Sequence, residues 1–262
     1  SLSQQIPTCL LIAPSKENVY PQFYPYSEAK VTPIKQFQKI VPESFPYIYP
    51  VESLKAVNDR SYRICDTHWT LHGARESSIL LAKKLIGKEE GLRELFQNDL
   101  YDAKEGFGDL GRKVYPPSSA KEDILSNYNY RNKVLFDNNL PNFGRIILIH
   151  NDTAFHASTI LFFGSSSAYS MFHFLSRIFQ TVAFVHTAGN VDQELIEQIR
   201  PDFFCMQTNA RFIVKSPTAN ESVKRYIESK RKTLEKPDDS EYIMADEIPD
   251  SIAQLVNYLR QL

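Results

Sequence analysis

An aspartate and a histidine stand two positions apart in the segment Asp66-Thr67-His68-Trp69. Side chains with this spacing can point to the same side of a turn, so the carboxylate of Asp66 can accept a hydrogen bond from Nδ1 of His68. That bond fixes the tautomer of the imidazole and leaves Nε2 as a base. The same short pattern also suits a structural pair beside a buried tryptophan, so the chemistry needs a second partner.

Three consecutive serines, Ser165, Ser166 and Ser167, follow Gly164 between an apolar run and a helical pattern. Reacting groups collect at the carboxyl ends of strands in open α/β sheets, and the first turn of a helix offers N–H groups to a developing oxyanion. Serines at this place are also ordinary helix caps, and the G-x-S-x-G motif is absent. Together with Asp-x-His, however, a serine here completes the set of nucleophile, base and orienting acid.

A metal site is the competing interpretation of the same residues. Asp66, His68 and His72 could act as ligands, since the two histidines have helical i, i+4 spacing. The glutamate of H-E-x-x-H is missing, and the third ligand would have to come from the same short segment. We therefore expect acid–base chemistry with no metal and no cofactor.

The elements that would carry these residues alternate between strand and helix. Short apolar runs predict buried strands at Thr8–Ala13, Arg145–His150, Thr159–Gly164, Thr181–Thr187 and Phe203–Gln207. Helical patterns cover 71–86 (ended by Gly87), 169–179, 192–199, 224–236 and the C-terminal segment from 250. This alternation predicts an α/β fold, in which a mostly parallel sheet has helices on both faces.

Two stretches do not follow this alternation. Residues 1–60 are rich in proline and tyrosine and predict an ordered but irregular N-terminal wrap, and residues 101–142 predict a loop-rich insertion. We expect one domain over 1–262. The segment 224–236 is expected to be a solvated charged helix.

The composition is that of a globular protein, with 42% apolar and 23% charged residues. The net charge of −1 lacks the basic excess that a general nucleic-acid surface requires, so nucleic acid is excluded as an expected partner. The three cysteines are sparse and unpaired in spacing, which argues against a disulfide framework. No run approaches the roughly 18 apolar residues of a membrane span.

In several ordered blocks the chain resembles the SGNH-hydrolase-like domain of the alginate O-acetyltransferases (the AlgJ/AlgX type). The D-T-H-W-x-x-x-G block is the most specific of them, and its Asp-x-His precedes the serine as in that family. The matching segments are Pro14–Pro21 (P-x-K-x-x-[IV]-Y-P), Asp66–Gly73, Gly108–Leu110 (G-D-L), Leu161–Ser166 (strand then G-[DTN]-S) and Arg200–Phe204, with Arg211 after it.

The resemblance implies an SGNH-hydrolase-like (flavodoxin-like) three-layer sandwich and a triad of Ser166, His68 and Asp66. It implies acetyl transfer to hydroxyls of a bacterial polysaccharide through an acyl-serine, with an acetyl donor that a membrane acyltransferase could deliver. Two departures from the family pattern are Ser165, where aspartate or threonine is commoner, and the block 207–210, which lacks the usual acidic residue before the arginine. The attacking serine could therefore also be Ser165 or Ser167.

Other candidate residues would serve the oxyanion or the substrate. Ser165, Asn209 and Arg211 are candidates for the oxyanion hole, and Tyr128 and Tyr130 could stack on sugar rings or simply pin their loop. The alternatives to transfer are an esterase with the same triad and an inactive polysaccharide-binding domain. The resemblance implies the bacterial cell envelope, whereas unpaired cysteines and the lack of a signal segment would suit the cytoplasm equally. The oligomeric state is left open.

Overall fold

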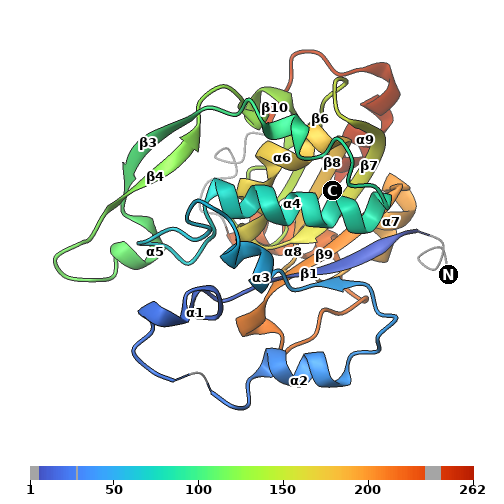
Figure 1. Ribbon diagram of the computed structural model, residues 1–262. Coiled ribbons are helices and arrows are strands. Elements are labelled where there is room, and N and C mark those ends of the chain that lie inside the picture. Colours follow the sequence, from blue (N-terminus) through green and yellow to red (C-terminus); the bar gives the residue numbers. More distant parts are fainter. Residues whose placement is uncertain (1–5, 28, 234–242) are drawn as a thin grey trace.

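The computed structural model describes residues 6–27, 29–233 and 243–262 (Figure 1). The strands are β1 (Thr8–Ala13), β2 (Tyr47–Ile48), β3 (Tyr101–Gly106), β4 (Ala120–Leu125), β5 (Val134–Asp137), β6 (Ile146–His150), β7 (His156–Gly164), β8 (Phe179–His186), β9 (Phe203–Asn209) and β10 (Ile243–Met244). The α-helices are α1 (Lys16–Val19), α2 (Pro33–Ile40), α3 (Val51–Lys55), α4 (Leu71–Ile86), α5 (Gly108–Gly111), α6 (Phe172–Ile178), α7 (Gln193–Ile199), α8 (Val223–Thr233) and α9 (Asp250–Gln261). Short 3-10 helices are η2 (Pro21–Phe23), η3 (Glu94–Phe96), η4 (Tyr130–Lys133), η5 (Ser166–Met171) and η6 (Ala210–Phe212).

The central sheet of the described residues has 8 strands in the order β10-β5-β6-β8-β7-β9-β1-β2. The five strands from β8 to β2 run parallel to one another. The remaining three, β6, β5 and β10, extend the sheet with antiparallel pairings. The expected mostly parallel α/β sheet is confirmed, and β6 lies antiparallel beside β8.

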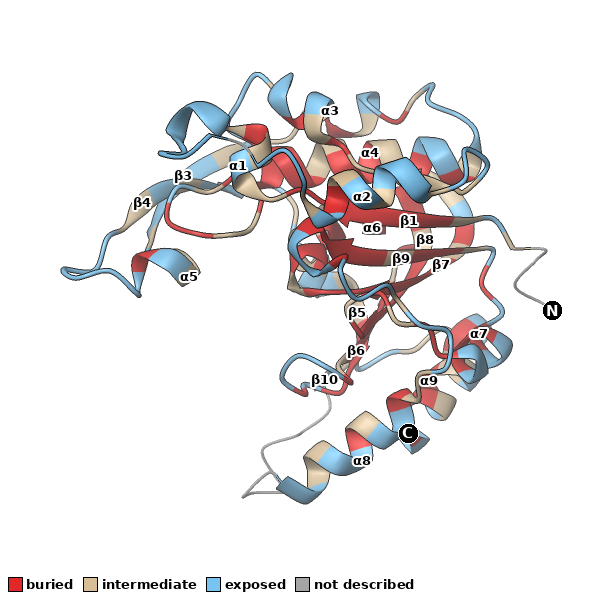
Figure 2. Cartoon of the chain, turned by 90° about the horizontal axis from the view of Figure 1, so that it is seen from below, coloured by how far each residue is buried: buried red, intermediate tan, exposed pale blue. Residues whose placement is uncertain are grey.

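Helices cover both faces of this sheet, so the molecule has three layers (Figures 1 and 2). Alternation along the strands sends successive side chains to opposite layers. In β7, Ile160 and Phe162 pack with α4 and α6, whereas Leu161 and Phe163 pack with α7, α8 and α9. A smaller cluster joins β1 to α2 through Leu10, Ile12 and Ile34. The sheet thus places the carboxyl ends of β7 and β9 side by side, between two well-packed hydrophobic layers.

The boundaries of α4 follow from its capping residues. The Thr70 side chain accepts a hydrogen bond from the backbone N–H of Gly73, and Gly87 ends the helix with a left-handed φ of 74°. Asp192 caps the start of α7 as Thr70 caps that of α4, because its side chain accepts a hydrogen bond from the N–H of Leu195. The helix expected over 169–179 instead begins as η5 at Ser166 and continues as α6, and Phe179 is the first residue of β8. The expected helix over 224–236 is observed as α8 to Thr233, and residues 234–236 lie outside the described part.

The segment 101–142 contains more regular structure than the loop-rich insertion expected. β3 and β4 pair antiparallel over six residue pairs, from Tyr101↔Leu125 to Gly106↔Ala120. We call this segment, residues 101–125 with α5 between the strands, the β3–β4 arm. It extends away from the main body in both views (Figures 1 and 2). Among the described residues, no helix has the length and apolar character needed to cross a bilayer.

Candidate active site

Three polar side chains from distant parts of the chain form one line of hydrogen bonds. Nδ1 of His68 lies 2.6 Å from Oδ1 of Asp66, and Nε2 of His68 lies 2.9 Å from Oγ of Ser166. An ionised carboxylate can only accept, so Nδ1 carries the imidazole hydrogen and donates it to Asp66. Nε2 is then an acceptor for the hydroxyl hydrogen of Ser166, which is the arrangement of an activated nucleophile.

Each of the three serines has a different partner. The backbone N–H and the hydroxyl of Ser165 both donate to Oε1 of Gln207, at 2.8 Å each. The hydroxyl of Ser167 donates to Oδ1 of Asn209 at 3.0 Å. Ser165 and Ser167 are buried, whereas Ser166 between them is partly exposed and faces His68. The structure therefore places one serine, Ser166, against the imidazole.

Gln207 is a residue whose part in the site the sequence did not reveal. It occupies the block where the resembled family has an acidic residue before the arginine, and it is completely buried on β9. Its amide oxygen accepts both bonds from Ser165, while its amide nitrogen donates to the carbonyl of Thr208 at 2.9 Å. Gln207 thus fixes the first residue of the turn that presents Ser166.

The acid and base lie on a short loop that doubles back on itself. An isolated antiparallel bridge joins Tyr62 to Trp69, and the N–H of Arg63 donates to the carbonyl of His68 at 3.1 Å. The indole N–H of Trp69 donates to the carbonyl of Ser167 at 2.8 Å. This buried tryptophan therefore ties the loop of the base directly to the turn of the nucleophile.

The environment of Asp66 keeps its carboxylate ionised. Burial by itself would raise the pKa of Asp66, but hydrogen bonds from the ring and the backbone N–H of His68 outweigh it. The positive charge of Arg63, whose Nη1 lies 3.8 Å from Oδ2, acts in the same direction. The net result is a pKa of Asp66 well below its usual range, as an orienting acid requires.

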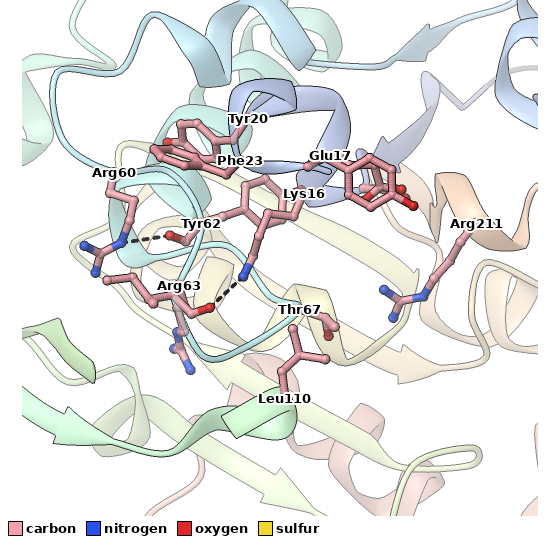
Figure 3. A pocket seen from close by; sticks show the side chains of 13 residues that line it. Lys16, Glu17, Tyr20, Phe23, Arg60, Tyr62, Arg63, Thr67, Leu110 and Arg211 are labelled. Carbon is pink, nitrogen blue, oxygen red and sulfur yellow. Dashed lines mark hydrogen bonds between the residues drawn. The ribbon is translucent and has the colours of Figure 1, made fainter. Parts of the chain in front are cut away.

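A pocket of about 620 Å³ has Thr67, the residue between Asp66 and His68, in its wall (Figure 3). The residues that line it do not include Asp66, His68 or Ser166. Its positive side chains, from Lys16, Arg60, Arg63 and Arg211, outnumber its one carboxylate, Glu17. Aromatic and aliphatic side chains form most of the remaining wall, and these are Tyr20, Phe23, Tyr24, Tyr62, Ile64 and Leu110. Arg60 is paired with Glu122, and Arg63 lies beside Asp66. The largely aromatic and aliphatic lining suits a ring-shaped ligand.

The candidate oxyanion and sugar-contact residues separate in the structure. Asn209 bonds to Ser167, the neighbour of Ser166, whereas Arg211 lines the pocket that has Thr67 in its wall. The hydroxyl of Tyr128 bonds instead with Ser176 of α6 at 2.8 Å, and the ring of Tyr130 packs edge-on against Phe172 of α6 at 5.5 Å. Their described contacts therefore pin the loop onto α6, and the structure does not bring these two tyrosines to the triad.

The metal-ligand set considered from the sequence is not brought together. His72 points to the β3–β4 arm, where its Nε2 lies 2.9 Å from Oδ2 of Asp123. A different set, Asp66, His68 and Asp109, has potential ligand atoms within 4.8 Å of one another. Its members are engaged in hydrogen bonds with one another, with Ser166 and with Thr67. The geometry therefore fits the acid–base arrangement better than a metal site.

Comparison with solved structures identifies proteins of the same fold. Bacillus cereus PatB1 with a sulfonyl adduct has a TM-score of 0.58 and 13% identity, and the match covers 85% of this chain and 86% of that chain. A DHHW family protein from Eubacterium siraeum has a TM-score of 0.55 and 11% identity over 80% of each chain. The O-acetyltransferase domain of Pseudomonas putida AlgJ has a TM-score of 0.50 and 16% identity, covering 88% of this chain and 85% of that chain.

These likenesses establish the fold. The expected SGNH-hydrolase-like α/β fold class, and the resemblance to the AlgJ/AlgX type at the level of fold, are confirmed. No family model matches the chain, and no curated protein sequence matches it.

Proposed function

We propose that this protein is a serine acyltransferase that moves an acyl group, acetyl in the first instance, from a donor to a hydroxyl of a polysaccharide. The observation that carries the proposal is the continuous hydrogen-bonded line from Asp66 through His68 to Ser166. A buried, ionised carboxylate, a tautomer fixed by it and a partly exposed hydroxyl are the three parts that such a reaction needs. The shared fold with the O-acetyltransferase domain of Pseudomonas putida AlgJ supports the same class of reaction.

The proposed reaction has two steps. Oγ of Ser166 attacks the carbonyl carbon of the donor ester while Nε2 of His68 takes the hydroxyl proton, and Asp66 stabilises the resulting imidazolium. His68 then returns the proton to the leaving group of the donor, and the acyl group stays on Ser166. In the second step Nε2 of His68 takes the proton of a sugar hydroxyl, and the sugar oxygen attacks the carbonyl carbon of the acyl-serine. The bond from that carbon to Oγ of Ser166 then breaks, and His68 returns the proton to Oγ, which restores the starting enzyme.

The negative oxygen that forms in both steps needs hydrogen-bond donors. The backbone N–H of Ser166 is the expected first donor, with the side-chain amide of Asn209 or the guanidinium of Arg211 as the second. Asn209 is suited to this because its Oδ1 accepts from Ser167, which fixes the orientation of its amide. Donors of this kind typically contribute about 10²–10³ in kcat. Ser165 takes part indirectly, through the shape of the turn.

The pocket beside Thr67 supports an acidic polysaccharide as the acceptor. The guanidinium of Arg211 in its wall can pair with a carboxylate or another anionic group, and its aromatic rings can pack on sugar faces. An acetyl donor would have to reach the same exposed face, and we propose that a membrane acyltransferase supplies it.

The test separates chemistry from binding. Wild type and the variants Ser166→Ala, His68→Ala and Ser165→Ala are incubated with p-nitrophenyl acetate, alone and with an acidic or a neutral oligosaccharide. The release of p-nitrophenol and the mass of the sugar are measured. We expect acetylated acidic sugar with wild type and no turnover with Ser166→Ala or His68→Ala.

Other outcomes point elsewhere. Acetate release without acetylated sugar would favour an esterase. If wild type neither turns over nor forms an adduct on Ser166 with phenylmethanesulfonyl fluoride, the chain is a binding domain and the proposal fails. The reagent is apt because a protein of the same fold, PatB1, has been solved with a sulfonyl adduct.

A further inference from the structure

The residue between the acid and the base is held by a carboxylate from the β3–β4 arm. The backbone N–H of Thr67 donates to Oδ1 of Asp109 at 2.7 Å, and its hydroxyl donates to Oδ2 at 2.6 Å. Both oxygens of one carboxylate therefore fix the backbone and the side chain of Thr67. Because Asp66 and His68 flank this residue, the position of Thr67 sets where both triad side chains begin.

Cys65, the residue before Asp66, is held by the backbone of the arm. The N–H groups of Leu110 and Gly111 donate to the carbonyl of Cys65, at 3.1 and 2.9 Å. This close approach requires glycine at Gly108, which has a φ of +61° and where an added Cβ would lie 2.1 Å from the Cys65 carbonyl oxygen. The loop and the arm are thus packed backbone against backbone beside Asp66.

A third contact holds Ile64, the residue before Cys65. The N–H of Ile64 donates to Oε1 of Glu122 at 2.8 Å, and the other oxygen of Glu122 accepts from Arg60 at 2.7 Å. The carbonyl of Ile64 accepts from the ammonium of Lys16 at 2.9 Å, a bond seen in Figure 3. Hydrogen bonds to residues outside the loop therefore hold Ile64, Cys65 and Thr67, which come just before and just after Asp66.

The arm itself contributes little to the core. Leu125 is buried at its base, and the other residues of β3 and β4 are intermediate or exposed. Tyr101 and Asp123 join the arm to α4 through His72, whose ring centroid lies 4.6 Å from that of Tyr101. The polar contacts described above are therefore directed mainly at the loop that carries Asp66 and His68.

We propose that the β3–β4 arm is the positioning element of the catalytic base, with Asp109 as its main positioning residue. Asp109 acts through Thr67, and the reacting atoms belong to Ser166 and His68. This inference rests on the proposed function, because it assigns Asp109 a part in presenting the base of that reaction. A misplacement of about 1 Å in such an arrangement can reduce the rate by about 10²-fold.

The experiment compares Asp109→Ala and Asp109→Asn with a matched control, Asp102→Ala, which changes an exposed aspartate on β3 of the same arm. With p-nitrophenyl acetate we expect Asp109→Ala to lower kcat by about 10- to 100-fold with KM within about twofold. Asp109→Asn, whose amide oxygen can still accept from the N–H of Thr67, should recover most of the rate. Asp102→Ala should match wild type.

A second pair of variants covers the case in which Asp109→Ala does not fold. Thr67→Ser keeps the hydroxyl bond to Asp109 and Thr67→Val removes it, so kcat should be lower in the Val variant than in the Ser variant. Equal rates for the Ser and Val variants would overturn the inference, as would a folded Asp109→Ala with the wild-type rate. So would an Asp109→Asn variant as slow as Asp109→Ala, since the charge and not the position would then matter.

A measurement without turnover separates this inference from the proposed function. The imidazole Nδ1 hydrogen that bonds to Asp66 gives a far-downfield proton NMR signal when the pair is well ordered. We expect this signal in wild type and Asp102→Ala, and its loss or broadening in Asp109→Ala. An inactive wild type that shows this dependence would refute only the proposed function. An unchanged signal in a folded Asp109→Ala would refute the positioning role.

Discussion

The two halves of the proposed triad are held by different kinds of structure. Ser166 lies at the end of β7, and its neighbours Ser165 and Ser167 bond to Gln207 and Asn209, two buried side chains of β9. The loop of Asp66 and His68 is held instead by a partly exposed arm that leaves the main body. The nucleophile is thus fixed by buried side chains of the sheet. The base is held by partly buried and exposed polar contacts with the arm, in addition to the buried bond from Trp69 to Ser167.

This difference separates stability from activity. A change beneath the nucleophile removes hydrogen bonds inside the core, so it should reduce both the free energy of unfolding and the rate. A change in the arm alters contacts that water can replace, so it should affect the rate mainly. The four predictions below test this division, from the largest expected effect on rate to the smallest.

Ser166→Ala should reduce kcat for p-nitrophenyl acetate by about 10⁶-fold, because the attacking atom is removed. Ser165→Ala and Ser167→Ala keep that atom and lose one hydroxyl bond each, so their rates should fall far less. Steady-state kinetics on the three purified variants makes the measurement. A wild-type rate in Ser166→Ala, or equal losses in all three, would contradict the assignment.

Asp66→Asn should reduce kcat by about 10⁴-fold, because the orienting carboxylate is lost from the base. It should also change how stability depends on pH. The folded-state pKa of Asp66 is held below that of the unfolded chain, so its ionised form stabilises the fold above the ordinary pKa of about 3.9. That contribution is lost as the pH falls through the lower folded-state pKa.

The measurement is urea unfolding of wild type and Asp66→Asn between pH 2 and 6. The stability advantage that wild type owes to this ionisation should shrink as the pH falls below about 4. The exposed variant Asp102→Asn serves as the control. A difference between wild type and Asp66→Asn that does not vary with pH would show that folding does not lower the pKa of Asp66.

Gln207→Leu tests the half of the site fixed by the sheet. It leaves the buried N–H and hydroxyl of Ser165 without their acceptor, which should cost about 1–3 kcal/mol of unfolding free energy. Because the serine turn then shifts, kcat should also fall, by about 10- to 100-fold. Denaturant unfolding and kinetics on the same sample decide the matter. A slow variant of undiminished stability would remove the distinction between the two halves.

Tyr128→Phe should have the smallest effect on rate. It removes the hydroxyl bond to Ser176, and neither residue has a described contact with the triad, so acetyl transfer to sugar should stay within about twofold of wild type. The unfolding free energy should fall by about 0.5–1.5 kcal/mol. A selective loss of transfer to sugar, with hydrolysis unchanged, would restore this tyrosine as a sugar contact.

The sequence predicted well those elements whose signals are local. Gly87 marks the end of α4 because a left-handed residue at this position favours glycine. The apolar runs of β7 and β8 are unambiguous because both faces of these strands are buried. The Asp-x-His spacing also identified a pair that needs no distant partner for its own bond.

The parts that depend on distant contacts could not be predicted in this way. The β3 sequence Tyr101–Gly106 is exposed and mostly polar, so it shows no alternation that would mark a strand. The sequence drew attention to the G-D-L motif and to the block 207–210, but it could not show which residues Asp109 and Gln207 contact. Their partners, Thr67 and Ser165, lie about 40 residues away from them. Tyr128 and Tyr130 have aromatic character that suits either a sugar or a core, and only packing against α6 distinguishes the two.

The exposure of the β3–β4 arm has a consequence for how the protein responds to heat. A two-stranded sheet with one buried residue at its base opens locally at a lower free energy than the central sheet. Each opening would release Thr67 and disorder the base while the core stays folded. Heating should therefore abolish the activity reversibly, at a temperature below the cooperative unfolding of the sheet. Amide hydrogen exchange should rise first in residues 101–125.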